Sequence, residues 1–244
     1  MPGVNYDNAA PVYAQQRRVH GFLVDEIVRG AEGLAGKRVL EVGCGPGGYL
    51  KAVVARTGGR GVGLDSSRGM LNQAGPGDGP SFVQGTANRL PFAPCVFALV
   101  YSIDVIHHLA DGPAYFQEAF RLAAPGGRVL TITDSADIIA AREPMARYWP
   151  ETVAVDLARY PGLDRLFMWM RQAGFAHPAA RQVERAFQVE DISPYRAKAF
   201  SMLHLISDEA FERGLRRLEA DLACGPVPGV IRYVCVWGQK SSPS

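Results

Sequence analysis

Two carboxylates and a group of glycines in the first third of the chain have the spacing of a nucleoside-binding site. The stretch RVLEVGCGPGGYL contains the pattern G-x-G-x-x-G from Gly43 to Gly48, and Glu41 comes just before it. Asp65 ends the next apolar run, GVGLD. Glycines let a loop turn tightly and approach an adenosine closely, and an acid at the end of the next strand can bind both ribose hydroxyls.

Two residues in and beside this loop argue against a dinucleotide as the ligand. In a dinucleotide fold the pyrophosphate is held by backbone N–H groups at a helix N-terminus, and Pro46 removes one of those donors. The carboxylate of Glu41 would repel the two phosphate charges. Both features suit a ligand that carries a cationic sulfonium and a free ammonium but no phosphate. Asp65 alone does not decide between the two ligands, because both contain a ribose.

A second group of reactive side chains lies in the stretch SIDVIHHLAD. Asp104, His107 and His108 directly follow an apolar run, which places them where ligands bind in parallel sheets. Imidazole titrates near neutral pH, so His107 is the first candidate for a general base and His108 the second. The alternative is that one of these histidines packs against the following helix or caps it.

Alternating strands and helices must position these residues. Short apolar runs alternate with amphipathic stretches, which is typical of βαβ units and a parallel sheet. The predicted strands are 38–42, 61–65, 81–85, 97–102, 128–134, 181–189 and 231–238. The predicted helices of the regular part lie within 47–56, 66–74, 111–127 and 162–175. Pro125 and the two glycines after it are expected to end the third of these helices. The sequence therefore predicts an α/β fold.

After Asp134 the pattern changes to irregular and helical stretches rich in proline and aromatic residues. We interpret the chain as one domain, 1–244, with a helical lid built from insertions, because long connections in compact domains are usually functional or disordered. Tyr148 and Trp149 either wall a pocket or belong to a core. The sheet core is expected at 31–134, 162–190 and 230–240. The lid is expected at 1–30, 135–161 and 191–223.

Composition restricts the class of partner. The chain has 244 residues, of which 48% are hydrophobic and 20% charged, and its net charge of +2 is too small to indicate a nucleic-acid partner. The first twenty residues lack the apolar core of a signal peptide, and no apolar run is long enough to span a bilayer. The four cysteines lie far apart, which predicts reduced thiols and no metal site. We expect a cytoplasmic monomer or homodimer that acts on a small molecule, without a membrane partner.

Five stretches resemble, in their order, the motifs of class I S-adenosylmethionine-dependent methyltransferases: VLEVGCGPGGYL, GVGLDSSRGML, QGTANRLPF, VYSIDVIHHLAD and EAFRLAAPGGRVLTITD. The branch with ubiquinone/menaquinone-type and small-molecule enzymes is the most similar. The resemblance covers 38–134 well, and 1–37 and 162–175 loosely. It implies a Rossmann-like, doubly wound seven-stranded sheet whose last strand is antiparallel, with S-adenosylmethionine as the cofactor.

The resemblance also implies which residues contact the cofactor. The backbone from Gly43 to Gly47 would hold its methionine part, and Asp65 would hold its ribose. Two positions that the family usually fills with aspartate are Thr86 and Ala98 here, so the adenine amino group has a weaker partner at Thr86. The complete set of implied cofactor residues is Tyr13, Glu41, Gly43, Cys44, Gly45, Gly47, Asp65, Ser66, Met70, Thr86, Ala87, Asn88 and Ser102.

The activity that the resemblance implies is in-line transfer of a methyl group to a small-molecule acceptor. In such a displacement the protein mainly aligns the reacting atoms and excludes water, and a general base is needed only if the acceptor must lose a proton. Two alternatives stay open. The chain could be an RNA or protein methyltransferase of the same fold, or a protein that binds the cofactor and catalyses a reaction without methylation.

The motifs predict that S-adenosylmethionine and S-adenosylhomocysteine bind to the chain and that nicotinamide dinucleotides do not. The physical reason is the missing N–H of Pro46 and the negative charge of Glu41 beside the loop. Titration calorimetry with S-adenosylhomocysteine and with NAD measures the binding of each ligand. Binding of NAD without any response to S-adenosylhomocysteine would contradict the prediction.

Overall fold

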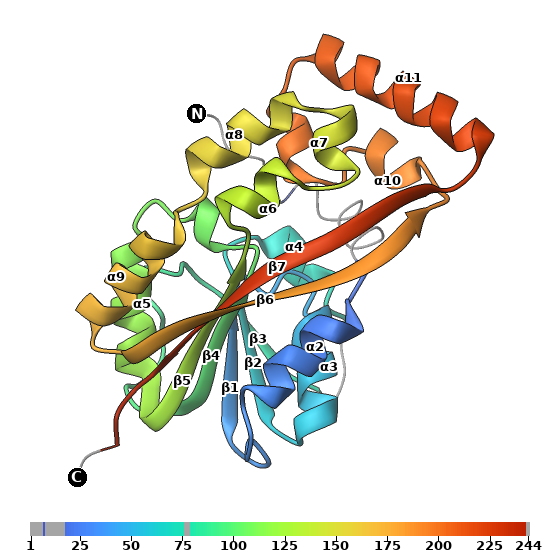
Figure 1. Cartoon of the computed structure of the whole chain (residues 1–244). Helices are drawn as coiled ribbons and strands as arrows, with labels where there is room; N and C mark the ends of the chain where they lie inside the picture. The colour runs from blue at the N-terminus through green and yellow to red at the C-terminus, as the bar shows by residue number, and fades with distance from the viewer. Residues whose placement is uncertain (1–6, 8–17, 76–78, 243–244) are drawn as a thin grey trace.

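A seven-stranded sheet runs through the middle of the molecule, with helices on both of its faces and further helices above one end (Figure 1). The structure is a computed structural model that describes residue 7 and residues 18–75 and 79–242. The strands are β1 (Arg38–Val42), β2 (Arg60–Asp65), β3 (Ser81–Gln84), β4 (Phe97–Ile103), β5 (Ala123–Thr133), β6 (Ala176–Val189) and β7 (Val227–Gln239).

The strand order is β3-β2-β1-β4-β5-β7-β6. The first five strands pair in parallel, whereas β7 pairs antiparallel with both β5 and β6. From β1 the successive strands β2 and β3 are added on one side, and β4 and β5 are added on the other side of β1. The carboxyl ends of β1 and β4 therefore border the crevice where ligands bind in such folds. The predicted α/β class, with a doubly wound seven-stranded sheet and an antiparallel last strand, is confirmed.

Both faces of the sheet are covered because successive side chains of its central strands are apolar. In β1, Val39 packs into the cluster under α2 (Gly21–Arg29) and α3 (Gly48–Thr57), whereas Leu40 packs into the cluster under α5 (Gly112–Leu122) and α9 (Leu163–Ala173). This alternation is what a parallel strand buried on both faces requires. Phe167 and Trp169 of α9 also pack against the cluster under α5 and α9.

Helix α2 lies in the core of the sheet domain, although 1–30 was expected to form part of the lid. Leu23 and Ile27 are completely buried, and α2 packs beside α3 on the face of the sheet (Figure 1). The apolar residues of GFLVDEIVR recur at helical spacing, which gives the helix one apolar side that must be covered. The expectation was wrong for 21–29, because this short amphipathic pattern was not recognised as a helix.

Helix α5 ends slightly before Pro125, the residue that was predicted to end it. The helix ends at Leu122, and Ala123 already has extended dihedral angles and opens β5. Pro125 explains the early end, because a proline disfavours helical geometry at the residue before it and has no N–H to donate. The short helix α4 (Arg68–Asn72) begins as expected, with the Ser67 hydroxyl accepting a hydrogen bond of 3.1 Å from the Met70 N–H.

A separate group of helices lies above the carboxyl ends of the parallel strands (Figure 1). We call them the lid helices: α6 (Ala136–Ala140), α7 (Met145–Tyr148), α8 (Glu151–Arg159), α10 (Ser193–Arg196), η2 (Ser201–His204) and α11 (Asp208–Cys224). They come from two segments far apart in the sequence, on either side of α9 and β6. Among the helices that the structure describes, none is both long and apolar enough to cross a membrane.

The lid helices have a hydrophobic core of their own, centred on Trp149. Its ring is fully buried and stacks on Tyr195 with a centroid distance of 5.5 Å, and its Nε1–H donates to the Phe211 carbonyl at 2.9 Å. Tyr148 is buried in the same cluster. These two aromatic residues therefore join the two lid segments to each other, and of the two roles considered for them the structure supports the core.

Two connections hold the lid helices to the sheet. The antiparallel pair of β6 and β7 continues beyond the end of β5. Val189, the last residue of β6, and Val227, the first of β7, pack into the core of the lid helices. Arg142, which follows α6, forms ion pairs with Asp134 at the end of β5 and with Asp156 of α8, the latter at 2.6 Å. Burial raises the pKa of Asp134 to about 7, and the charge of Arg142 opposes this rise.

Replacing Trp149 with alanine should destabilise the protein by about 3–5 kcal/mol, because it opens a large cavity and removes a buried hydrogen-bond donor. Urea unfolding followed by circular dichroism measures the change in the free energy of unfolding. Met168→Ala is the control, since Met168 is 44% exposed and its loss should change stability by less than about 0.5 kcal/mol. Equal effects of the two substitutions would contradict a lid core built on Trp149.

Candidate active site

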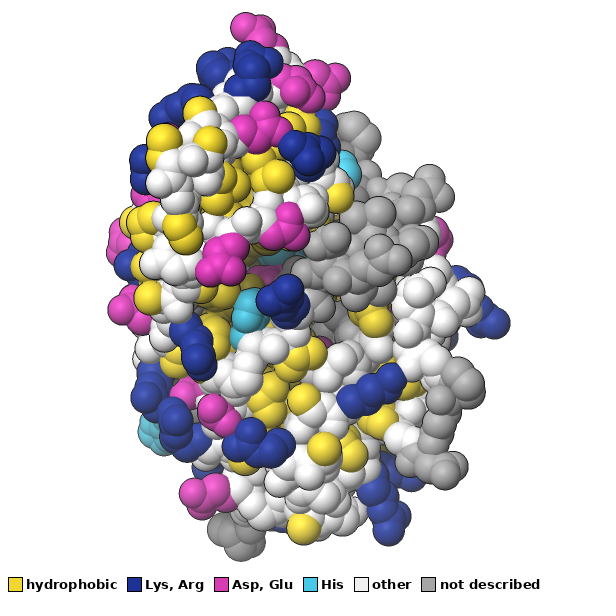
Figure 2. Space-filling view, turned by 90° about the vertical axis from the view of Figure 1, so that its right-hand side faces the viewer, with side chains coloured by type: hydrophobic (Ala, Val, Ile, Leu, Met, Phe, Trp, Pro, Cys, Tyr) yellow, Lys and Arg dark blue, Asp and Glu magenta, His cyan; other side chains and the backbone are white. Residues whose placement is uncertain are grey.

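A cavity of about 170 Å³ opens at the carboxyl ends of β1, β2 and β4, beside the point where the strand order reverses. Its walls come from the glycine loop, the end of β2, the loop after β3 and the segment after β4. The face in Figure 2 has a recess between its upper and lower parts, with histidine and acidic side chains in it. The cavity is lined by Val42, Gly43, Gly45, Leu64, Asp65, Ser66, Met70, Gly85, Ala87, Ile103, Asp104, Val105, His108 and Leu109.

The backbone amides of the glycine loop are already used within the chain. The N–H groups of Gly43 and Cys44 both donate to the carbonyl of Leu64, at 2.7 and 3.0 Å, and that of Gly47 donates to the carbonyl of Cys44 at 2.9 Å. The remaining amide, that of Gly45, donates to the Asp65 carboxylate at 2.7 Å. From Gly43 to Gly47 no amide is therefore left for a pyrophosphate, in agreement with the argument from Pro46 and Glu41.

The Asp65 carboxylate joins the two loops that border the cavity. One oxygen accepts from the Gly45 N–H, and the other accepts from the Ser67 N–H at 2.9 Å. Burial raises the pKa of Asp65, while these backbone hydrogen bonds act in the opposite direction. Each carboxylate oxygen can accept about two hydrogen bonds, so Asp65 keeps acceptor capacity for the two hydroxyls of a ribose.

Two loop glycines have backbone conformations that other residues rarely adopt. Gly43 has φ of 70°, and a Cβ there would lie 2.3 Å from Cγ2 of Val105. Gly47, which caps α3, has φ of 76°, and a Cβ there would lie 2.4 Å from the ring of Phe82. The loop therefore packs directly against β3 and the segment after β4, and only glycine permits this approach.

The structure brings six of the thirteen expected cofactor residues to the cavity wall. These six are Gly43, Gly45, Asp65, Ser66, Met70 and Ala87. Thr86 and Asn88 are exposed in the turn on either side of Ala87 and do not line the cavity. Tyr13 lies outside the described residues. The sequence motifs alone could not separate wall residues from their neighbours, because this depends on which way each side chain points.

The other four expected residues lie behind the wall. Gly47 is buried at the start of α3. The thiol of Cys44 is buried below the loop, and burial together with the charges of Glu41 and Asp65 raises its pKa, so the thiol stays protonated. Glu41 is buried beside Tyr101. Ser102 is completely buried on the other face of the sheet, where it accepts a hydrogen bond of 3.2 Å from the Tyr115 hydroxyl, and it does not line the cavity.

The two histidines after β4 have different environments. They lie in a single 3₁₀ turn, Ile106–His108, and His108 is exposed and lines the cavity. His107 does not line the cavity, and its ring stacks on Tyr160 at the end of α8, with a centroid distance of 3.9 Å and an angle of 14°. Of the pair, His108 is therefore the one that faces the cavity, and His107 contacts Tyr160.

Asp104 is a further wall residue, and its backbone conformation is unusual. Its φ is 57°, and its carboxylate accepts a hydrogen bond of 2.9 Å from the Tyr233 hydroxyl of β7. The apolar neighbours Val105 and Leu109 complete this side of the cavity. The sequence analysis did not name Val105 and Leu109 as site residues. Their positions on either side of the histidines in DVIHHL were a signal that could have suggested a place in the cavity wall.

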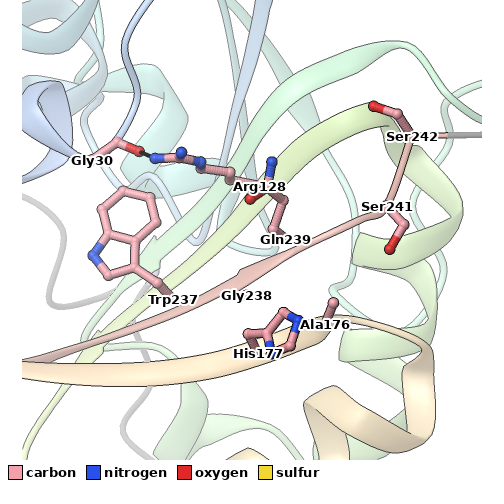
Figure 3. A pocket seen from close by; sticks show the side chains of 9 residues that line it. All are labelled: Gly30, Arg128, Ala176, His177, Trp237, Gly238, Gln239, Ser241 and Ser242. Atoms are coloured by element: carbon pink, nitrogen blue, oxygen red, sulfur yellow. Dashed lines mark hydrogen bonds between the residues drawn. The ribbon is translucent and has the colours of Figure 1, made fainter.

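A second cavity, of about 520 Å³, lies at the opposite end of the parallel strands (Figure 3). It is bordered by the Trp237 ring, the Arg128 side chain and the end of β7, and Arg128 donates to the Gly30 carbonyl. Among the residues that the structure describes, neither the glycine loop nor any other expected site residue lines it. Although it is the larger cavity, it lies away from the strand ends where ligands bind in this class of sheet.

Comparison with known proteins agrees with this geometry. Residues 40–131 match a family model described as a methyltransferase domain. The ubiquinone biosynthesis O-methyltransferase of Ruegeria pomeroyi is 32% identical over 151 residues, which are 57% of this chain and 60% of that protein. The chain thus spans less than two thirds of this relative.

Two solved structures share the fold at low sequence identity. The putative methyltransferase from an antibiotic biosynthesis pathway of Anabaena variabilis has a TM-score of 0.71 at 20% identity, over 92% of this chain and 99% of that one. The [4+2]-cyclase SpnF has a TM-score of 0.64 at 17% identity, over 98% and 94%. Residues 40–131 thus carry a methyltransferase domain of the class I S-adenosylmethionine-dependent type, and the two solved structures show the same fold over more than nine tenths of the chain.

Proposed function

We propose that this protein is an S-adenosylmethionine-dependent methyltransferase with a small-molecule acceptor. Two features together carry the proposal. The amides of the glycine loop are already hydrogen-bonded within the chain, and the neighbouring Asp65 carboxylate can still accept hydrogen bonds. This pairing suits an adenosine that carries no phosphate. When bound, the cofactor supplies a methyl group on a positively charged sulfur, which needs no further activation.

The residues of the cavity have distinct roles in this proposal. Asp65 accepts hydrogen bonds from the ribose hydroxyls, and Met70 and Ala87 border the adenine. Glu41, on the strand that leads into the loop, provides negative charge for the amino-acid end of the cofactor. The adenosine end therefore lies toward β2 and β3, and the acceptor end lies toward the segment after β4 and the lid helices.

The acceptor side holds the groups that could take a proton. Asp104 and His108 line this side of the cavity, and the likeness to an O-methyltransferase favours a hydroxyl acceptor. A hydroxyl must lose its proton during methyl transfer, and an imidazole with a pKa near neutrality is suited to accept it. We therefore assign the proton acceptor to His108 and give His107 a packing role against Tyr160.

A reaction without methyl transfer is the second candidate, because the chain shares its fold with a [4+2]-cyclase. Fold alone does not determine the reaction. Incubation with cofactor that carries a labelled methyl group, together with catechol and simple phenols as acceptors, separates the two candidates. Appearance of the label in a phenolic product supports methyl transfer, whereas binding of the cofactor without any labelled product favours the second candidate.

Asp65→Asn should weaken the binding of S-adenosylhomocysteine by roughly 100-fold, since two charge-assisted hydrogen bonds to the ribose become weak ones or are lost. Titration calorimetry gives the dissociation constants. Asp25→Asn is the matched control, because Asp25 is exposed on α2 and forms its ion pair with Arg56 at 2.8 Å, away from the cavity. Unchanged affinity in Asp65→Asn would show that the ribose assignment is wrong.

His108→Ala should lower the rate of methyl transfer to a phenolic acceptor by roughly 10²–10⁴-fold, the range for loss of a general base. His107→Ala should have a smaller effect, since the ring of His107 stacks on Tyr160 and does not line the cavity. Initial rates with labelled cofactor between about pH 6 and 9 bracket the titration of imidazole. The assignment fails if His108→Ala retains full activity over this range, or if His107→Ala is the more damaging of the two.

A further inference from the structure

A row of contacting side chains connects the lid helices to the wall of the cavity at the carboxyl ends of β1, β2 and β4. His108 lines this cavity, and its ring centroid lies 4.0 Å from that of His107. His107 stacks in turn on Tyr160, with a centroid distance of 3.9 Å. On the lid side, the guanidinium of Arg159 lies over the Tyr160 ring, 5.5 Å from its centroid. The row thus joins the end of α8 to the 3₁₀ turn after β4.

Buried ion pairs fix the end of the row that belongs to the lid. Tyr160 directly follows α8, and its N–H donates to the Asp156 carbonyl at 2.9 Å. The side chain of Asp156 is completely buried and forms ion pairs with Arg142 at 2.6 Å and with Arg159 at 2.7 Å. Arg159 also donates to the Ser201 hydroxyl of η2 at 2.9 Å. Because a buried charge that loses its partner is costly, these contacts hold the backbone that carries Tyr160.

The other end of the row has less support of its own. His107 and His108 belong to a 3₁₀ turn of three residues, and such turns have poorer hydrogen-bond geometry than an α-helix. His108 is exposed, and an exposed side chain changes rotamer on a timescale of picoseconds to nanoseconds unless its neighbours restrict it. Contacts from outside the turn must therefore orient the two imidazoles.

Tyr160 supplies such a contact as a neutral ring. Burial, and then the negative charges of Asp104 and Asp134, raise the pKa of Tyr160 well above its usual value, so the phenol keeps its proton. Stacked aromatic rings attract each other beyond the effect of burying their surface. The ring of Tyr160, fixed by the lid helices, is therefore able to hold the ring of His107.

We propose that Tyr160 is a positioning residue for His108: its ring holds the imidazole of His107, and His107 limits the rotation of the His108 ring at the cavity wall. This inference rests on the proposed function, in which His108 takes a proton from the acceptor. A general base must lie within hydrogen-bond reach of the proton that it removes. Tyr160 does not line the cavity itself, so its loss should affect turnover and leave cofactor binding unchanged.

Tyr160→Leu tests this role, because it removes the ring, whereas Tyr160→Phe removes only the hydroxyl and keeps the stack. Proton–carbon NMR spectra record the imidazole signals of the five histidines, and the variants His107→Ala and His108→Ala assign the two signals of interest. Both signals should move in Tyr160→Leu and stay in place in Tyr160→Phe. The signal of His177, which borders the other cavity, should stay in place in both variants.

Methyl transfer to a phenolic acceptor gives a second readout. Tyr160→Leu should lower turnover by roughly 10- to 100-fold, because a small displacement of a catalytic group can cost about 100-fold, and the KM for the cofactor should stay the same. Tyr160→Phe should keep the turnover of the unmodified protein. Tyr160→Leu should add little to His108→Ala in the double variant, because both changes act through one group.

Two further variants keep the test independent of the stability of the lid. His107→Ala breaks the row at its middle without changing the lid helices, so the His108 signal should move there as well, and turnover should fall by less than in His108→Ala. Tyr195→Leu is the matched control, since it removes another buried tyrosine of the lid helices, one that stacks on Trp149. Its His108 signal should be that of the unmodified protein.

The inference is overturned if the His108 signal stays in place in Tyr160→Leu and in His107→Ala. Equal losses of turnover in Tyr160→Leu and Tyr160→Phe would overturn it too, because the hydroxyl and not the ring would then matter. If the unmodified protein transfers no label to any acceptor, the proposed function fails, and the NMR spectra still decide whether Tyr160 orients His108.

Discussion

The geometry of the site depends on one carboxylate that accepts hydrogen bonds from two loops. Asp65 binds the Gly45 N–H with one oxygen and the Ser67 N–H with the other. This contact fixes the glycine loop after β1 against the start of α4 after β2, although the two loops are twenty residues apart. Because the same carboxylate faces the cavity, the group that orders the loops is also the one that can bind a ribose. Structure and binding are therefore coupled at this residue.

The lid helices and the sheet domain are packed separately and meet at a few contacts. Within the described part of the chain, the wall of the cavity comes from the ends of β1, β2 and β4 and the loops near them. The lid helices have their own core around Trp149 and meet the sheet through Arg142 and through the stack of Tyr160 on His107. The lid helices and the wall of the cavity are therefore separately packed parts of one chain.

Sequence patterns predicted the sheet and the cavity-lining positions of Gly43, Gly45 and Asp65, but not the direction of other side chains. The strands around the glycine loop and Asp65 were predictable because apolar runs, glycines and the terminal acid are local signals. The packing of α2 was missed because a short amphipathic pattern was given too little weight. The direction of the Ser102 side chain, and which of His107 and His108 lines the cavity, could not be predicted from the sequence. They depend on the strand face that Ser102 occupies and on the geometry of the 3₁₀ turn, which long-range packing determines.

Amide hydrogen exchange with and without S-adenosylhomocysteine tests most directly whether the cavity at the strand ends is the cofactor site. Bound ligand should slow exchange at the amides after Asp65 and in the segment after β4, both of which border this cavity. Exchange around Arg128 and Trp237, beside the larger cavity, should stay the same. Protection confined to the region of Trp237, or none at either place, would contradict the assignment.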